Sequence, residues 1–220
     1  MKRHLYRVTQ FAALAISVCV MAATGAVPTP AGAQTKYLVE PLAELKITQL
    51  PPGPLYWRVA TFPTIEQAKS AAGAYRWNEN TVSYDGSPSL VAEAAGKVWL
   101  FTLGDKGAAT PGGNMVAEIG PITAVTAPEY LLRVNHGSGP PNSKTPAHTH
   151  PGSEAFYVVT GRLGQRTPHG VSYTEAGQTM NGHAPDTPMQ VFNAGTSELT
   201  ALIMFVVDAT KPFSVPAELP

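Results

Sequence analysis

The chain has 220 residues, which is enough for one domain with an extension. Charged residues make up only 14%, and the 20 glycines and 21 prolines exclude a helical bundle. The apolar share of 44% falls in discrete runs, which excludes a disordered chain. We therefore expect a mainly β protein built from short strands and many turns.

The N-terminal segment, residues 1–33, is typical of a bacterial signal peptide. Basic residues precede an apolar stretch at residues 11–23, and Ala31-Gly32-Ala33 offers a cleavage site. An uncleaved N-terminal anchor is the alternative. Cleavage would leave twelve basic and fifteen acidic residues, no cysteine and no second apolar run of membrane length. We expect a periplasmic or secreted protein that binds no nucleic acid and has no membrane span after cleavage.

Residues 34–84 are predicted to form an N-terminal extension. Residues 55–62 alternate loosely and suit a strand. A short helix follows, with Thr64 as the N-cap and Gln67 as its capping-box partner, and it ends near Ala74.

Residues 85–210 contain the remaining predicted strands, and residues 211–220 form a tail. Short strands separated by turns indicate a sandwich or barrel. An alternative is that residues 34–125 form a second, metal-free barrel. The predicted strands are residues 89–94, 97–103, 130–135, 155–160, 163–166, 171–174, 189–192 and 199–207.

The segment from His148 to Glu154 carries the strongest chemical signal. In a strand, residues two apart face the same side, so His148 and His150 would direct their imidazoles into one space. Glu154 begins the next apolar strand. Two imidazoles and a carboxylate suit a divalent transition metal such as iron, manganese, zinc, copper or nickel.

This segment resembles the first motif of the cupin superfamily, G-x5-H-x-H-x3-4-E-x6-G. His148, His150, Glu154 and Gly161 match it, whereas Asn142 stands in place of the leading glycine. A spacer of fifteen residues then leads to Gly177, as in the family. The resemblance covers roughly residues 129–207 and implies a jelly-roll β-barrel with a metal held by the three matching side chains.

The second cupin motif, G-x5-P-x-G-x2-H-x3-N, is eroded. Counting from Gly177 puts Pro188 in place of the histidine ligand, and counting back from Asn193 puts Met189 there. Three alternatives stay open: His183 replaces the missing ligand, the metal is held by three residues, or no metal binds.

Other residues are weaker candidates. Phe156, Met180, Met189 and Gln190 are predicted to line the barrel cavity if the strand register turns them inward. His136 and His169 are interpreted as solvated loop residues.

The resemblance implies two classes of function. The first is a metal-dependent enzyme of the dioxygenase, isomerase or decarboxylase type acting on a small organic molecule. The second is a non-catalytic protein that binds or stores a small ligand in the barrel. Barrels of this kind often pair through an edge strand, so a homodimer is also expected.

Overall fold

The computed structural model describes residues 36–72, 87–123 and 125–219. The predicted signal peptide and the predicted helix end near Ala74 lie outside these ranges. No described helix is long and apolar enough to cross a membrane. The elements are β1 (Leu38–Ile47), β2 (Tyr56–Phe62), α1 (Ile65–Ala71), β3 (Ser89–Ala94), β4 (Lys97–Gly104), β5 (Asn114–Ile119), β6 (Tyr130–Gly139), β7 (His148–Thr149), β8 (Gly152–Thr160), β9 (Arg162–Thr167), β10 (Gly170–Glu175), β11 (Thr179–Asn181), β12 (Gln190–Asn193), β13 (Leu199–Asp208) and β14 (Val215–Pro216).

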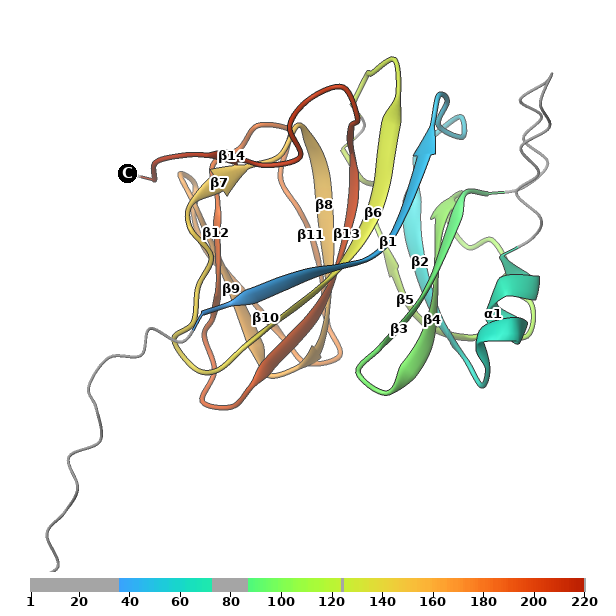
Figure 1. Cartoon of the computed structure of the whole chain (residues 1–220), viewed down its shortest axis with the longest axis horizontal. Coiled ribbons are helices and arrows are strands. Elements are labelled where there is room, and N and C mark those ends of the chain that lie inside the picture. Colours follow the sequence, from blue (N-terminus) through green and yellow to red (C-terminus); the bar gives the residue numbers. More distant parts are fainter. Residues whose placement is uncertain (1–35, 73–86, 124, 220) are drawn as a thin grey trace, which may run out of the picture. The chain divides into compact units, whose positions relative to one another are not determined.

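The strands form antiparallel sheets, as expected for a mainly β jelly-roll (Figure 1). A five-stranded sheet has the order β1-β6-β13-β8-β11, and a three-stranded sheet has the order β10-β9-β12. A short pair joins β14 to β7, and a separate sheet has the order β3-β4-β2-β5. The two larger sheets of the barrel are hydrogen-bonded separately, so the barrel is not closed by a continuous ladder.

The central strand β13 explains the long apolar run near the C-terminus. Its residues alternate between two cores: Leu202 and Met204 belong to one, and Ile203 and Phe205 to the other. The core that contains Ile203 and Phe205 lies inside the barrel. The core that contains Leu202 and Met204 also includes side chains of the four-stranded sheet. Because both faces of β13 are buried, its sequence is apolar at nearly every position.

The four-stranded sheet contains the predicted hairpin of β3 and β4. Ala95 and Gly96 both have positive φ in its turn, as a two-residue hairpin requires. Helix α1 packs against this sheet, and the Thr64 hydroxyl accepts a hydrogen bond from the Gln67 backbone N–H as predicted.

The predicted end of the N-terminal extension at residue 84 does not separate one sheet from another. β2 comes from the predicted extension but pairs with β4 and β5, and β1 joins the barrel by pairing with β6. β1 was not predicted because Pro41 and several charged residues interrupt its apolar pattern. Such a sequence is tolerated at a sheet edge, where one side of the strand needs no ladder partner.

Candidate functional site

A cavity of about 400 Å³ is lined by all three residues of the predicted metal motif, His148, His150 and Glu154. Its volume falls in the range of small-molecule sites. Its walls come from both barrel sheets and from the C-terminal segment, and most of them are apolar. The apolar lining includes Val39, Val191, Ile203, Phe205 and Phe213.

The two histidines lie edge to face, with ring centroids 4.8 Å apart. Nδ1 of His148 lies 2.8 Å from the carbonyl oxygen of Pro146, and Nδ1 of His150 lies 2.6 Å from that of Phe213. A neutral ring bound in this way carries its proton on Nδ1, which leaves the lone pair on Nε2. Burial lowers the pKa of His150 to about 4, so this ring is neutral at physiological pH.

The C-terminal segment holds these histidines in place. β14 pairs with β7, with Val215 opposite Thr149 and Pro216 opposite His148. The Phe213 ring packs against His150, with centroids 4.7 Å apart. Residues 211–220 were predicted only as a tail, because nothing in their sequence indicates a partner more than sixty residues away.

Glu154 has a hydrogen-bond partner of its own, Gln165. Glu154 is only 3% exposed, and its Oε1 accepts a hydrogen bond from Nε2 of Gln165 on β9. Burial raises the pKa of Glu154 to about 8, although the Gln165 bond opposes the shift. The carboxyl group is therefore mostly protonated at neutral pH.

Tyr37 and Gln165 are site residues that the sequence did not reveal. Tyr37 lines the cavity and is 3% exposed, yet its hydroxyl has no hydrogen-bond partner in the described part of the chain. Burial, followed by the charge of Glu154, raises its pKa. The signal for Gln165 is a polar residue at an inward position of a strand, whereas Tyr37 precedes its strand and shows no signal.

The donor set suits a divalent transition metal in its chemistry but is incomplete in its geometry. Two neutral imidazoles with free Nε2 atoms, oriented by backbone carbonyls, are typical metal ligands. However, in residues 36–72, 87–123 and 125–219 no three His, Cys, Asp or Glu side chains are placed to hold one ion. The histidine pair thus fits a metal, whereas Glu154 is engaged by Gln165.

His183, the predicted substitute ligand, is not among the residues that line the cavity. It lies half-buried in the loop between β11 and β12. Burial lowers its pKa, with a smaller contribution from His169, so these two histidines neighbour each other. The loop itself lies against the site, because the Gly182 N–H donates to the Glu154 carbonyl and the Asp186 N–H donates to the His150 carbonyl.

The four predicted cavity residues do not line the cavity either. Phe156 is fully buried in the barrel core, and Met180 packs against that core. Met189 is buried with its sulfur 3.5 Å from Gln165 Nε2. Gln190 turns outward, because the register of β12 on β9 places it opposite exposed Arg166 and directs Val191 inward.

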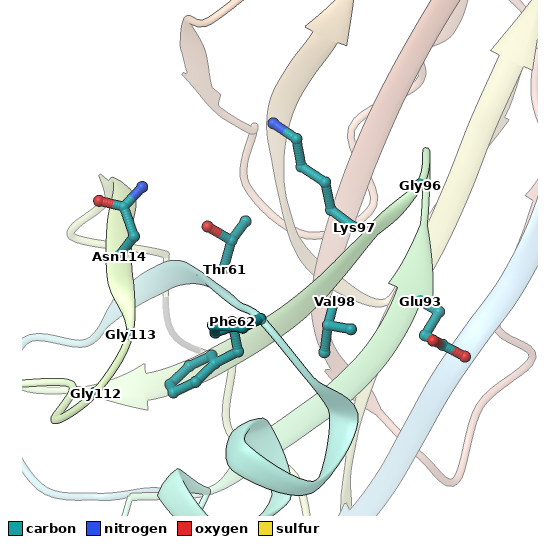
Figure 2. Close-up of a pocket in the computed structure, with 10 residues that line it drawn as sticks. Thr61, Phe62, Glu93, Gly96, Lys97, Val98, Gly112, Gly113 and Asn114 are labelled. Carbon is teal, nitrogen blue, oxygen red and sulfur yellow. The ribbon is translucent and has the colours of Figure 1, made fainter.

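Another hollow, of about 940 Å³, lies on the four-stranded sheet (Figure 2). Thr61, Phe62 and Asn114 line it, and it contains none of the predicted site residues. The side chains of Lys97 and Glu93 extend in opposite directions (Figure 2), so they form no joint polar centre.

No family model and no curated protein matches this sequence. Solved structures are similar to it over part of the chain. A double-stranded β-helix protein from Klebsiella pneumoniae is 20% identical, covers 40% of this chain and 70% of its own, and has a TM-score of 0.34. A cupin domain from Bordetella pertussis is 22% identical, covers 34% and 80%, and has a TM-score of 0.30. A DMSP lyase from Ruegeria pomeroyi is 17% identical, covers 39% and 43%, and has a TM-score of 0.34.

These similarities concern the fold. The alignments span less than two thirds of several of the matched proteins, including a protein of unknown function from Streptococcus pyogenes at 64%. The similar structures include enzymes, among them an oxalate oxidase and a polyketide cyclase. In the described structure the first predicted motif lies on β7 and β8, and the hairpin of β9 and β10 forms the spacer that follows it.

Proposed function

We propose that this protein is an exported cupin-type protein that binds a divalent transition metal through His148 and His150 and a small organic molecule in the surrounding cavity. The observation that carries the proposal is the paired arrangement of the two rings. Each Nδ1 is fixed by a backbone carbonyl, and the rings lie 4.8 Å apart in one cavity. Metal-binding histidines are commonly oriented in this way.

Burial of the site supports the same proposal. His150 stays neutral at physiological pH, and only a neutral imidazole can bind a metal. Glu154 is buried, and no cation of the described residues lowers its pKa. A cation in the cavity would favour its ionised form and so make the carboxylate available as a third ligand.

The cavity walls define the second ligand. Apolar side chains surround a few polar groups, which is typical of sites for small organic molecules. The unpartnered hydroxyl of Tyr37 can donate a hydrogen bond to an oxygen of such a molecule. The Glu154 carboxyl can give up or receive a proton at its oxygen beside the bound molecule.

A metal bound here would supply Lewis-acid polarisation of a ligand oxygen. The chain's own residues would bind and orient the ligand, exclude water and move a proton at Glu154. The proposal therefore includes an enzyme of the dioxygenase, isomerase or decarboxylase type.

Metal analysis of the mature protein tests the proposal. We expect a stoichiometric transition metal in the wild type and its loss in His148→Ala and in His150→Ala. His169→Ala is the matched control, because His169 lies outside the cavity, and it should keep the metal. A wild type that takes up no iron, manganese, zinc, copper or nickel after refolding with each would contradict the proposal.

Sequencing the N-terminus of the protein from a periplasmic fraction tests export, with Gln34 as the expected first residue.

A metal-free protein that binds a small ligand is the second candidate. The observation that favours it is that, among the described residues, no three His, Cys, Asp or Glu side chains are placed to hold one ion. This candidate predicts that ligand binding survives a chelator and the His148→Ala change. The metal-dependent candidate predicts that both treatments abolish ligand binding.

A further inference from the structure

The outer face of the three-stranded sheet carries a further hollow, of about 460 Å³. It shares no lining residue with the barrel cavity. It lies over β9, β10 and β12. Inward residues of these strands, such as Leu163 and Val191, fill the barrel, whereas the alternate residues face outward. The outward residues combine aromatic rings with positive charge.

The floor of this hollow is aromatic. Tyr173 and Phe192 flank Gly164 in adjacent strands, and all three face outward in one row. Gly164 lets the rings approach, because a Cβ there would overlap with the Phe192 ring. The rings meet edge to face with centroids 6.3 Å apart, and Tyr173 is 53% exposed. Exposed rings of this kind offer a flat apolar surface to a ligand.

Positive charges border the aromatic floor. Lys144 pairs with Phe192 across the sheet and faces outward with it, and Arg166 follows Gly164 by two residues on the same face. The Arg162 guanidinium stacks on Tyr173 at 4.4 Å, and its charge is paired with Glu175 at 2.9 Å. Lys144 and Arg166 have no ion-pair partner among the described residues, and no carboxylate lines the hollow.

We propose that this hollow is a binding site for an organic anion with a flat ring, of the aromatic carboxylate class. The carboxylate would lie between the Arg166 guanidinium and the Lys144 ammonium group, and the ring would lie on Phe192 and Tyr173. Arg166 can bind both carboxylate oxygens, while Lys144 acts as a point charge. Single exposed cations are normally only solvated, but here two unpaired cations share a hollow with aromatic rings.

The arrangement also explains which ligand features matter. A small anion without a ring would gain only exposed electrostatic contacts, which salt screens. A ring without charge would gain only apolar contact with partly exposed side chains. The site is therefore expected to select for ligands that carry both groups.

Titration of the full mature protein, followed by amide chemical shifts, tests the proposal with three probes. We expect saturable binding of benzoate, with shifts in β9, β10 and β12, and at least about tenfold weaker binding of uncharged benzamide and of inorganic phosphate. Arg166→Gln should raise the benzoate Kd about tenfold or more. Lys97→Gln is the matched control, because Lys97 lies near the ring of Trp99 on the other sheet, and it should leave the Kd unchanged.

Four results would overturn the proposal. Benzoate could show no saturable binding, or bind no better than benzamide. The Kd could be the same in wild type and Arg166→Gln, or the shifts could be confined to residues of the barrel cavity. Binding of benzoate should persist in His148→Ala, which separates this site from the metal site. If the face is instead covered by a second copy of the chain, sedimentation will show a dimer and benzoate will not bind.

Discussion

The barrel and the four-stranded sheet differ in how many polar residues they bury. Of the thirteen buried polar or charged residues that are described, eleven lie between Asn135 and Asp208 in the barrel. The four-stranded sheet has only Arg58 and Thr102. Its centre is filled instead by large apolar side chains, among them Trp57, Trp99, Phe101 and Leu103.

The difference indicates where function lies. Burying a polar group without a partner costs about 1–3 kcal/mol, so a fold accumulates such groups only where something compensates for them. The barrel keeps a buried carboxyl, a neutral histidine and an unpartnered tyrosine around one cavity. The described part of the four-stranded sheet buries only two polar side chains, Arg58 and Thr102, so we interpret it as a structural support.

The largest effect is expected from Trp99→Ala in the four-stranded sheet. Trp99 is fully buried, lies 5.8 Å from the Tyr157 ring and donates a hydrogen bond to the Ala94 carbonyl. The substitution should lower the unfolding free energy by about 3–5 kcal/mol, because it removes a large side chain and leaves a cavity. Urea unfolding measures it, with exposed Val171→Ala as the control. A loss below about 1 kcal/mol would mean that this sheet is not part of the cooperative fold.

Removal of the C-terminal segment tests how the barrel holds its histidines. Deleting residues 211–220 removes the carbonyl that accepts the His150 hydrogen and the strand beside His148. We expect the affinity for zinc to fall about 10- to 100-fold, because such outer partners orient the ligands. A chelator competition assay measures this. Deletion of residues 217–220 keeps β14 and is the matched control; equal zinc affinity in the two truncated proteins would contradict the interpretation.

The pH dependence of stability tests the buried carboxyl. Burial raises the pKa of Glu154 from its ordinary 4.5 to about 8. Between pH 6.5 and 8 the folded protein keeps this proton and the unfolded chain does not, so the unfolding free energy should fall as pH rises, by about 2 kcal/mol. His150 and His183, whose pKa values are lowered, act in the opposite sense, mostly below pH 6.5, and offset only a small part of this fall.

Urea unfolding of the metal-free protein at pH 6.5 and 8 measures this fall. In Glu154→Gln the fall should disappear, whereas in exposed Glu198→Gln it should remain. A wild-type profile that is flat over this window would show that Glu154 is already ionised.

The smallest effect is expected from Tyr37→Phe. The substitution removes a buried hydroxyl that has no partner among the described residues, so stability should stay constant or rise by up to about 1 kcal/mol. The matched control is Tyr130→Phe, because the Tyr130 hydroxyl accepts a hydrogen bond from the Ala127 N–H and its loss should destabilise. Thermal unfolding compares the two. A clear loss of stability in Tyr37→Phe would mean that the hydroxyl has a partner.

Much of the fold could be predicted because its signals are local. The turn at Ala95 and Gly96, the hairpin of β9 and β10 and the apolar run of β13 each depend on residues close together in the chain. β1 escaped prediction because it is a polar edge strand, and its place beside β6 depends on a partner about ninety residues away. Gln190 was placed wrongly for a related reason, since a register is fixed only by the neighbouring strand.

The sequence by itself determined the class of fold and one half of the site. The spacing of His148 and His150 puts both rings on one cavity, because alternation along an extended chain is a property of the backbone. The tertiary structure decided the rest. Phe213 and Tyr37 reach the cavity from distant segments, and the Gln165 amide reaches Glu154 from β9, so only the tertiary packing brings these groups together.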